Sequence, residues 1–450
     1  MNLDNYLSDY KIISDIIHGS ISLSKLAMLI IDTPEFQRLR YIKQLSTCYF
    51  VYPNAIHTRF EHSIGTYHLC KKLLYALKNK SKQSELDIIK DIPELYIYFN
   101  QNNITYNYLN NFIIELISIG ALCHDVGHAC FSHLFDDYFL KNNVINNITN
   151  NNKYIYHEYR SCVILEHIIN KNDILKSIID DNLLKFIFNI INPNSEIHNG
   201  YIYQIVSNSL NSIDVDKFDY LTRDSKMLGI NISFNFNRLI ENAMVINNII
   251  CYSKKTDTDI VNLFLTRHYL HKKVYSHKSV IASLLLINEI LIIINKYYDF
   301  TSYLNDINKF IMLTDNFILT MARYHSMKDE KLKNIINKLD SHNLYTLIYN
   351  TYLDINDNLS YDIKNYIDSD NKIIYFENII GFISGKKNNP LDNVYLYGTK
   401  DPYNELSILS KSDSNKLLPN KYQEKIVLIF YIDSHDKEKI NKIQKKLSNI

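Results

Sequence analysis

Three histidines and an aspartate occur within ten residues of the segment Ala121-Leu-Cys-His-Asp-Val-Gly-His-Ala-Cys-Phe-Ser-His133. On a helix, His124 and His128 would share one face, and Asp125 would lie about 100° round from His124. A single histidine or aspartate would more often be a satisfied polar group. Imidazole beside carboxylate is costly to bury, however, unless something charged is bound there. These residue types therefore predict a divalent cation held by mixed nitrogen and oxygen ligands.

A second segment carries His57, Arg59 and His62 within six residues, just before a helix predicted over residues 66–78. A metal ion needs ligands from several segments, because one helix cannot surround it. By itself, His62 would be read as a polar residue near a helix start. Beside the cluster at 124–133, it is the natural third ligand.

A third segment, residues 213–224, places Asp216, Tyr220 and Asp224 at i, i+4 and i+8, on one stripe of a helix with Lys217 beside it. A surface helix with scattered salt bridges would explain the same charges equally well. As a fourth source of ligands, Asp216 completes a set of two histidines and two aspartates. The predicted metal ligands are His62, His124, Asp125 and Asp216.

These residues must be positioned by a chain of 450 residues, which is long enough for two or three domains or one large helical domain. The net charge of +1 gives no global basic field, so nucleic-acid binding is not indicated. The first residues lack the basic-then-apolar order of a signal peptide. The longest apolar run, residues 283–295, is interrupted by Asn288 and Glu289 and is too short to span a bilayer, so we expect a buried helix.

The six cysteines are scattered and form no CxxC pair, which fits a reducing compartment. We therefore expect an intracellular protein, cytoplasmic or nuclear, without a membrane partner. Cys123 and Cys130 flank the histidine cluster and raise the alternative of a zinc site, but their spacing favours small buried hydrophobic residues.

Helical patterns dominate to about residue 350. Thr33-Pro34-Glu35 predicts a helix start, and the basic residues that follow fit its solvated face. Residues 79–111 are polar and irregular and residues 142–153 are rich in asparagine, so both are predicted surface insertions. From Asn371 short apolar runs alternate with turns, which indicates a small α+β lobe. The runs are 373–376, 394–397 and 426–431.

Two further helices carry polar groups. His157 and Glu158 come early in a helix that continues to residue 169. The segment from Arg267 to Lys278 is basic and aromatic at helical spacing. A cationic helix suits a polyphosphate, whose charge must be neutralised, although a solvated basic helix would show the same pattern.

Five of these segments resemble the HD-domain phosphohydrolases, and within them the dNTP triphosphohydrolases that combine a sterile alpha motif (SAM) domain with an HD domain. The segments are 36–45, Arg59-Phe-Glu-His62, His124-Asp-Val-Gly-His128, Phe131-Ser-His133 and 213–220. The resemblance covers residues 10–300 well and the C-terminal lobe more loosely, and we expect no counterpart of the SAM domain.

The resemblance implies a mainly α fold, an HD-domain helical core with a small C-terminal α+β lobe. The expected domains are residues 1–50 with a nucleotide activator site, 51–350 with the catalytic site and both insertions, and 351–450.

The resemblance also implies hydrolysis of a dNTP at its α-phosphorus, which releases deoxynucleoside and intact triphosphate, by an enzyme of dNTP catabolism. The four ligands above would hold a divalent metal, whether Mg, Mn, Fe or Zn. His133 would protonate the leaving 5′ oxygen, with Asp136 near it, and the phosphate-proximal support would be His128, His157 and Glu158. The triphosphate clamp would be Arg59, Lys217, Tyr220, Arg267 and, less securely placed, Lys278. The sugar would be bound by Gln44, Leu45 and Asp224, and Tyr275 would leave no room for a 2′-hydroxyl.

A guanine-nucleotide activator site is implied as well, at Lys11, Asp32, Gln37 and Arg40. Such a site lies between subunits in the family, so a homo-oligomer, a dimer or tetramer, is expected. A simpler interpretation is that Asp32 caps the helix that starts near Pro34.

The sequence departs from the family pattern at several positions. Residues 46–48 replace an expected glycine run in the sugar pocket, and Ser276 stands in place of a glutamine after the tyrosine. The basic residues of a neighbouring dNTP effector site are absent, except that Lys255 remains near it. They would be expected near Met244, Ser253 and Asn404.

Two other functions remain open. The chain could be an HD nucleotidase or phosphodiesterase for another nucleotide, although Gln44, Asp224 and Tyr275 favour a deoxynucleotide. It could also bind a nucleotide or nucleic acid without turnover, but the complete ligand set argues against this.

Overall fold

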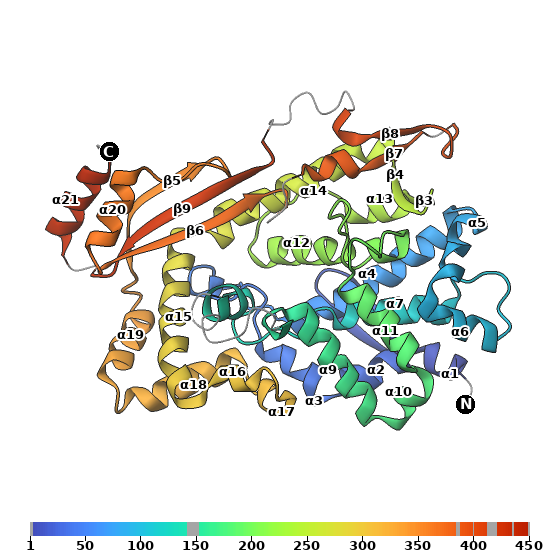
Figure 1. Ribbon diagram of the computed structural model, residues 1–450, viewed down its shortest axis with the longest axis horizontal. Coiled ribbons are helices and arrows are strands. Elements are labelled where there is room, and N and C mark those ends of the chain that lie inside the picture. The colour runs from blue at the N-terminus through green and yellow to red at the C-terminus, as the bar shows by residue number, and fades with distance from the viewer. Residues whose placement is uncertain are drawn as a thin grey trace.

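Helices make up most of the molecule in the computed structural model (Figure 1), which confirms the mainly α prediction. The structure describes residues 3–141, 153–383, 388–398, 400–411, 421–433 and 436–448. The predicted insertion at 142–153 lies outside the described residues except for Lys153.

The centre of the fold is α7 (Asn111–Cys123), which is buried along nearly its whole length. The Asn110 side chain caps it by accepting hydrogen bonds from the backbone N–H groups of Phe112 and Ile113. A helix that is apolar all round belongs in a core. Three helices of the HD core pack against it: α4 (Arg59–Lys80), α9 (His157–Lys171) and α11 (Asp181–Ile191). A further helix, α12 (Val215–Met227), packs against α4.

Residues 79–111 are irregular only in part, although their polar composition predicted an irregular segment throughout. They include α5 (Gln83–Leu86), a 3₁₀ turn (Asp87–Asp91) and α6 (Pro93–Gln101), whereas residues 102–110 form turns and loops. The reason for the helices is a sparse apolar spacing within the polar sequence. The buried side chains are Leu86, Ile89, Leu95 and Phe99.

The N-terminal segment is a hairpin of β1 (Asp9–Asp15) and β2 (Gly19–Ser24), followed by α2 (Lys25–Ile31). The predicted helix does start at Pro34, with the Thr33 side chain as its cap, but α3 (Pro34–Gln37) is only one turn and continues as a 3₁₀ turn (Arg38–Tyr41). Thr33, and not Asp32, therefore caps this helix.

Arg38 is buried, although the amphipathic pattern predicted a solvated side chain. Its guanidinium donates hydrogen bonds to the backbone carbonyl oxygens of Val126 (2.5 Å) and His128 (2.8 Å). These bonds fix the turn that carries the metal-site residues, and they explain why the side chain turns inward.

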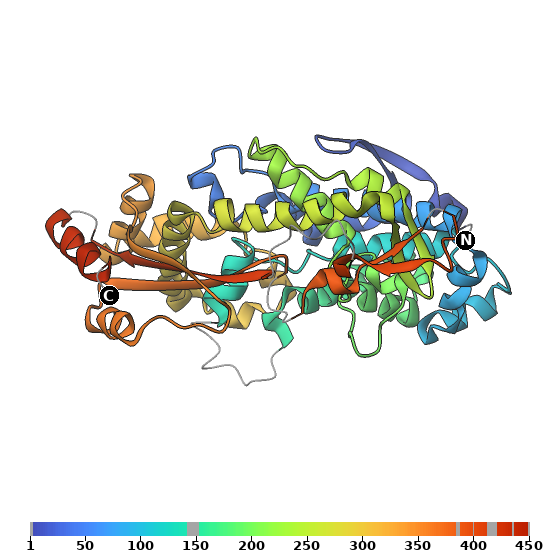
Figure 2. The ribbon, with the colours of Figure 1, turned by 90° about the horizontal axis from the view of Figure 1, so that it is seen from above.

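The C-terminal part contributes to two sheets. A three-stranded antiparallel sheet has the order β5 (Thr346–Leu353), β9 (Gln423–Tyr431), β6 (Ile373–Gly381). It lies away from the β1–β2 hairpin (Figure 2), with α20 (Tyr361–Ser369) and α21 (Lys437–Ser448) beside it in Figure 1.

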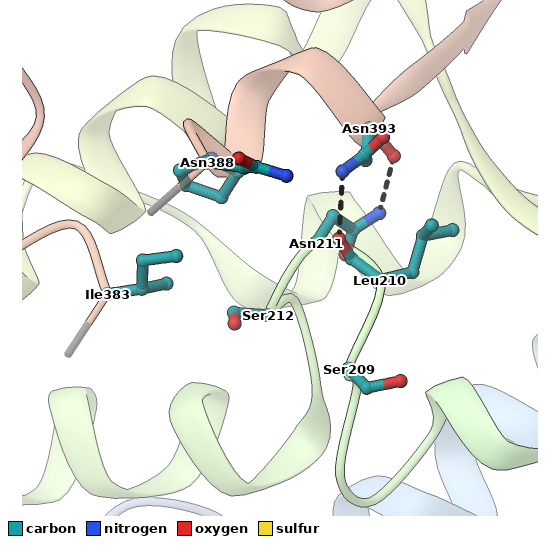
Figure 3. A pocket seen from close by; sticks show the side chains of 8 residues that line it. Ser209, Leu210, Asn211, Ser212, Ile383, Asn388 and Asn393 are labelled. Atoms are coloured by element: carbon teal, nitrogen blue, oxygen red, sulfur yellow. Dashed lines mark hydrogen bonds between the residues drawn. The ribbon is translucent and has the colours of Figure 1, made fainter. Parts of the chain in front are cut away.

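The predicted run at 394–397 does not join that lobe. It forms β7 (Tyr395–Tyr397), which pairs in parallel with β4 (Ile249–Ser253) in the sheet of order β3 (Ala243–Ile246), β4, β7, β8 (Leu406–Ile408). Reciprocal hydrogen bonds reinforce this junction. Asn211 Nδ2 donates to the Asn393 carbonyl (3.1 Å), and Asn393 Nδ2 donates to the Leu210 carbonyl (3.2 Å), as Figure 3 shows. The C-terminal chain is thus tied to the loop that precedes α12.

The remaining helices connect these parts. Their bounds are α1 (Asp4–Leu7), α10 (Asp173–Ile178), α13 (Phe236–Glu241), α14 (Asp257–Leu270), α15 (Lys278–Tyr298), α16 (Phe300–Tyr303), α17 (Ile307–Phe310), α18 (Asp315–Ser326) and α19 (Glu330–Asp340). By length and composition alone α15 could cross a membrane. Most of its apolar side chains, however, are buried in the protein core, as predicted for residues 283–295.

Candidate active site

The four predicted metal ligands lie together. His62 comes from the first turn of α4, His124 and Asp125 follow the end of α7, and Asp216 lies in the first turn of α12. His62 Nε2 is 3.3 Å from His124 Nε2, 3.1 Å from Asp216 Oδ1 and 3.4 Å from Asp125 Oδ2. Ligands about 2.1 Å from one ion, at ordinary angles, are about 3.0 to 3.4 Å apart. The spacing therefore fits one divalent ion.

The hydrogen bonds of the two histidines also fit a metal ion. His62 Nδ1 is 2.8 Å from Asp219 Oδ2, and His124 Nδ1 is 2.8 Å from the Ala121 carbonyl oxygen. These acceptors require a hydrogen on each Nδ1, so two neutral rings would turn both Nε2 lone pairs toward each other. A cation between them removes that repulsion.

The charges around His62 also favour a bound cation. Burial alone would lower the pKa of His62, but the hydrogen bonds to Asp216 and Asp219 raise it to about 10. Burial alone would raise the pKa of Asp125, but the Arg59 guanidinium holds it well below its usual range. The site therefore demands positive charge, which a proton supplies on His62 and a metal ion would supply in its place.

His124 and His128 do not share a helical face, contrary to the prediction, because α7 ends at Cys123 and residues 124–127 form turns. Gly127 lies in this turn, at a point where there is no room for a side chain. A Cβ there would lie 2.1 Å from the His157 carbonyl oxygen and 2.4 Å from the Ser161 nitrogen. The glycine lets α9 pack closely against the turn, which brings His157 to His128.

Around His128 the structure gathers the expected phosphate-proximal groups. The buried His128 ring stacks on His157, with centroids 3.9 Å apart. His128 Nε2 is 3.5 Å from Asp125 Oδ1, and His128 Nδ1 is 3.4 Å from Asp136 Oδ2. Burial, followed by repulsion from Arg59 and His157, lowers the pKa of His128 to about 3, so the ring is neutral at pH 7.

Asp136 and His133 are not ion-pair partners. Asp136 is buried and pairs with Arg160 Nη2 at 2.5 Å, whereas His133 Nδ1 lies 3.4 Å from Asp137 Oδ2. The surrounding protein disfavours the charged His133 ring, but the hydrogen bond and charge of Asp137 raise its pKa above the ordinary value. Asp137 was missed in the sequence, although its i+4 spacing from His133 was a signal.

His128, His133 and His157 offer nitrogen atoms within 4.8 Å of one another. A second metal ion there conflicts with the rings of His128 and His157, which are stacked at 18°. Imidazole lone pairs lie in the ring plane, and one ion cannot readily lie in the planes of two stacked rings whose centroids are 3.9 Å apart. The stacked geometry therefore does not favour a second metal ion at this cluster.

A cavity of about 670 Å³ extends from the metal-site residues, within the usual range for ligand sites. Its lining includes most of the predicted substrate and catalytic residues: Gln44, Leu45, Arg59, His128, His133, His157, Glu158, Lys217, Tyr220, Asp224, Arg267 and Tyr275. The pocket in Figure 3 is smaller, about 240 Å³, and none of the described residues that line it has an ionisable side chain. The larger cavity is the candidate active site.

Asp224, which also lines the cavity, is held from two sides. Its Oδ1 lies 2.7 Å from His57 Nε2, and its Oδ2 accepts a 2.5 Å hydrogen bond from the Tyr275 hydroxyl. Gln44 Oε1 is buried and has no hydrogen-bond partner among the residues that the structure describes. It is therefore available to a ligand.

The basic side chains of the predicted clamp do not all line this cavity. Lys217 and Arg267 line the cavity, but Lys217 also pairs with Asp214 at 3.1 Å, and Arg267 donates to the Gly381 carbonyl oxygen. Lys278 begins α15 and lines another pocket, because a π-helical turn (His271–Tyr275) breaks the helix that the spacing predicted.

Several cavity residues had no signal in the sequence analysis. Phe376 and Asn378 come from β6, in the C-terminal lobe, and His271 comes from the π-helical turn. Phe376 stacks on Tyr138, with centroids 5.4 Å apart. The lobe therefore forms part of the candidate active-site wall.

Among the predicted activator residues, Arg40 Nε donates to Gln37 Oε1 (2.8 Å), and the Arg40 guanidinium lies 3.5 Å from the Phe60 ring centroid. Gln37 Nε2 donates to the Ile31 carbonyl oxygen (2.8 Å). Lys11 and Asp32 are exposed. The Asp32 side chain does not cap α3, because that role belongs to Thr33.

Comparison with known proteins assigns this architecture to a class. The HD domain family matches residues 59–224, from Arg59 at the start of α4 to Asp224 in α12. A putative HD domain-containing protein, L394 of Acanthamoeba polyphaga mimivirus, is 37% identical over 418 residues, which cover 87% of this chain and 86% of the viral protein. The chain belongs to the HD-domain family.

Within that family, its relatives include proteins named deoxynucleoside triphosphate triphosphohydrolase SAMHD1. The Dictyostelium discoideum homolog is 32% identical over 445 residues, which cover 96% of this chain and 79% of the relative. The Homo sapiens protein is 30% identical over 479 residues, with 94% and 71% covered. These similarities confirm the resemblance described from the sequence.

Proposed function

We propose that this protein hydrolyses dNTPs to deoxynucleoside and inorganic triphosphate, with a divalent metal ion as cofactor. The observation that carries the proposal is one cavity lined both by three of the four metal-site residues, His124, Asp125 and Asp216, and by the Asp224–Tyr275 pair. The fourth, His62, is buried beside them, 3.1 Å from Asp216 Oδ1. The names of the SAMHD1 relatives support the same substrate class.

The four ligands would hold the metal ion, which when bound polarises the α-phosphate and lowers the pKa of a water molecule. Side chains of the protein supply the other positive charges at the phosphates. Arg59 Nε donates to Ser132 Oγ (2.9 Å), and its Nη1 donates to Asp125, so the guanidinium is held rigidly beside the phosphate end of the cavity. Lys217 adds a second positive charge on the cavity wall.

His133 serves as the proton donor to the leaving 5′ oxygen. Its side chain is 61% exposed and lines the cavity, so it can reach a bound ligand. Its raised pKa keeps part of the ring in the acid form near neutral pH. The neutral His128, with His157 stacked on it, forms the wall behind the phosphate.

Deoxyribose is selected at the other end of the cavity. Asp224 and Gln44 present acceptor oxygens for the 3′-hydroxyl. The Tyr275 ring, anchored through its hydroxyl to Asp224, occupies the space that a 2′-hydroxyl would need. Without the hydrogen bond to Asp224, the Tyr275 ring could rotate away from the sugar and would no longer exclude a 2′-hydroxyl.

We expect the purified protein with Mn²⁺ or Mg²⁺ to convert dATP to deoxyadenosine and triphosphate, and to leave ATP intact. Chromatography that separates triphosphate from mono- and diphosphate products measures this outcome. In Tyr275→Ala, loss of the ring should reduce the preference for dATP over ATP by about tenfold or more, since steric discrimination of this size is worth about 1–3 kcal/mol. Equal hydrolysis of ATP and dATP by the wild type would instead indicate a broader nucleotidase.

We also propose activation by a guanine nucleotide at Lys11, Asp32, Gln37 and Arg40, in a homo-oligomer. The Asp32 carboxylate can accept two hydrogen bonds from the N1 and N2 donors of guanine, a pattern that adenine does not offer. Lys11 and Arg40 can neutralise phosphates. The exposure of Asp32 and the cap supplied by Thr33 support this role.

The Asp32→Asn variant should fold as stably as wild type but lose its response to GTP. The amide presents a donor where guanine also presents donors, whereas the helix keeps its Thr33 cap. Turnover and oligomer size, each with and without GTP, measure the effect, and a thermal melt controls for stability. A wild-type enzyme indifferent to GTP in both measurements would refute the activator site.

A further inference from the structure

The turn between β1 and β2 reaches the helix that carries a metal ligand. His18, in this turn, lies with its Nε2 2.7 Å from Asp219 Oδ1, and the two side chains are 2% and 0% exposed. The other oxygen of Asp219 lies 2.8 Å from His62 Nδ1. A single buried carboxylate thus joins the N-terminal hairpin to a metal ligand from α4.

Arg223 closes the same network. Its Nε and Nη2 bind the two oxygens of Asp219 at 2.8 and 2.9 Å, and its Nη1 binds Asp15 Oδ2 at 2.8 Å. Asp15 also shapes the turn, because its Oδ1 accepts hydrogen bonds from the backbone N–H groups of Ile17 (2.8 Å) and His18 (2.9 Å). Two aspartates and one arginine are therefore buried together, and each depends on the others for its charge partners.

Gly65, one turn beyond His62 on α4, provides the space for this network. A Cβ at residue 65 would lie 1.9 Å from Asp219 Oδ1 and 2.6 Å from Arg223 Nη2. Any side chain would displace Asp219 from His62. The close approach of α12 to α4 at this point is thus built into both helices.

We infer that the β1–β2 hairpin is a positioning element of the metal centre, in which His18 and Asp15 hold the Asp219–Arg223 pair and this pair orients His62. His18 and Asp15 touch neither the metal ligand nor the active-site cavity, so they act through Asp219. The inference rests on the proposed metal site but is independent of the identity of the substrate.

The two strands of the hairpin are supported unequally. Ile21 and Leu23 of β2 are fully buried in the core, whereas Tyr10 and Ile12 of β1 and Ile16 of the turn are 65%, 69% and 63% exposed, and a two-stranded hairpin is at best marginally stable by itself. The docking of β1 and of the turn should therefore depend on the buried contacts of His18 and Asp15. By thermodynamic linkage, metal binding at His62 should in turn stabilise the docked hairpin.

The test is binding of Mn²⁺ alone to metal-stripped protein, measured by equilibrium dialysis with elemental analysis. His18→Ala should raise the Mn²⁺ Kd by about 10-fold, the lower end of the effect of removing an outer partner of a ligating histidine, because His18 acts one step further out, through Asp219. His18→Gln should recover most of the affinity, because its amide N–H can replace Nε2 as donor to Asp219. His167→Ala is the matched control, since His167 pairs with Glu35 at 3.3 Å and is not in the network.

Hydrogen exchange of the hairpin amides gives a second readout. Mn²⁺ should slow exchange over residues 9–24 in wild type and His167→Ala, and should have much less effect in His18→Ala. Asp15→Asn tests the idea if His18→Ala fails to fold, and it should also weaken Mn²⁺ binding. Folded variants at Asp15 and His18 with wild-type Mn²⁺ affinity would overturn the inference. Wild-type protein that binds no Mn²⁺ would overturn the metal site itself.

Discussion

Asp216→Ala should lose its bound metal and lower kcat for dNTP hydrolysis by about 1,000-fold or more. The carboxylate lies 3.1 Å from His62 Nε2 and 3.5 Å from His124 Nε2, so its removal takes away one ligand and the negative charge that draws a cation. A metal ion stabilises charge on a phosphoryl group by several kcal/mol, and about 4 kcal/mol corresponds to about 1,000-fold.

Elemental analysis and steady-state kinetics measure the two effects of Asp216→Ala. Lys226→Ala is the matched control, because Lys226 is exposed in the last turn of the same helix. Circular dichroism should show wild-type helicity in both variants. Unchanged metal content in a folded Asp216→Ala protein would mean that α12 supplies no ligand.

His133→Gln should lower kcat by about 100- to 10,000-fold, the usual contribution of a general acid. The reason is that glutamine can donate a hydrogen bond to the leaving oxygen but cannot transfer a proton. In wild type, the rate should fall as the pH rises through the raised pKa of His133, because the ring then loses the proton that it must donate.

Asp137→Asn separates this role from a structural one. Without the carboxylate 3.4 Å from Nδ1, the pKa of His133 should fall, and the alkaline decline in kcat should move to lower pH. Activity at the acidic end of the profile should stay close to wild type. A pH profile that is the same in wild type, His133→Gln and Asp137→Asn would exclude His133 as the acid.

Local sequence was sufficient to predict the class of fold and the types of ligand. The apolar helical patterns and the start at Pro34 depend on interactions within a few residues, and these survive in the structure. The segments with Arg59 and His62, His124 and Asp125, and Asp216 could be identified because charged side chains cannot be buried together without a counter-charge. That constraint can be read from residue types before any contact is known.

Tertiary structure decided which groups act on one another. Helical periodicity put His128 on the face of His124, but α7 ends before both, and α9 packs closely against Gly127 in the turn that follows. The resemblance placed Asp136 near His133, whereas in the structure Arg160, on another helix, holds Asp136 in a buried ion pair. A local sequence pattern shows neither the packing of α9 against Gly127 nor the ion pair between Asp136 and Arg160.

The same is true of residues that approach from far along the chain. His18 and Asp219 are 201 residues apart, and β6 brings Phe376 to a cavity formed mainly by the HD core. The local sequence around a histidine in a turn or a phenylalanine in a strand does not indicate which distant residues it will contact. Only the packing of α12 against Gly65 and of β6 beside the cavity determines that these residues belong to the site, because burial and hydrogen bonding there depend on contacts between distant segments.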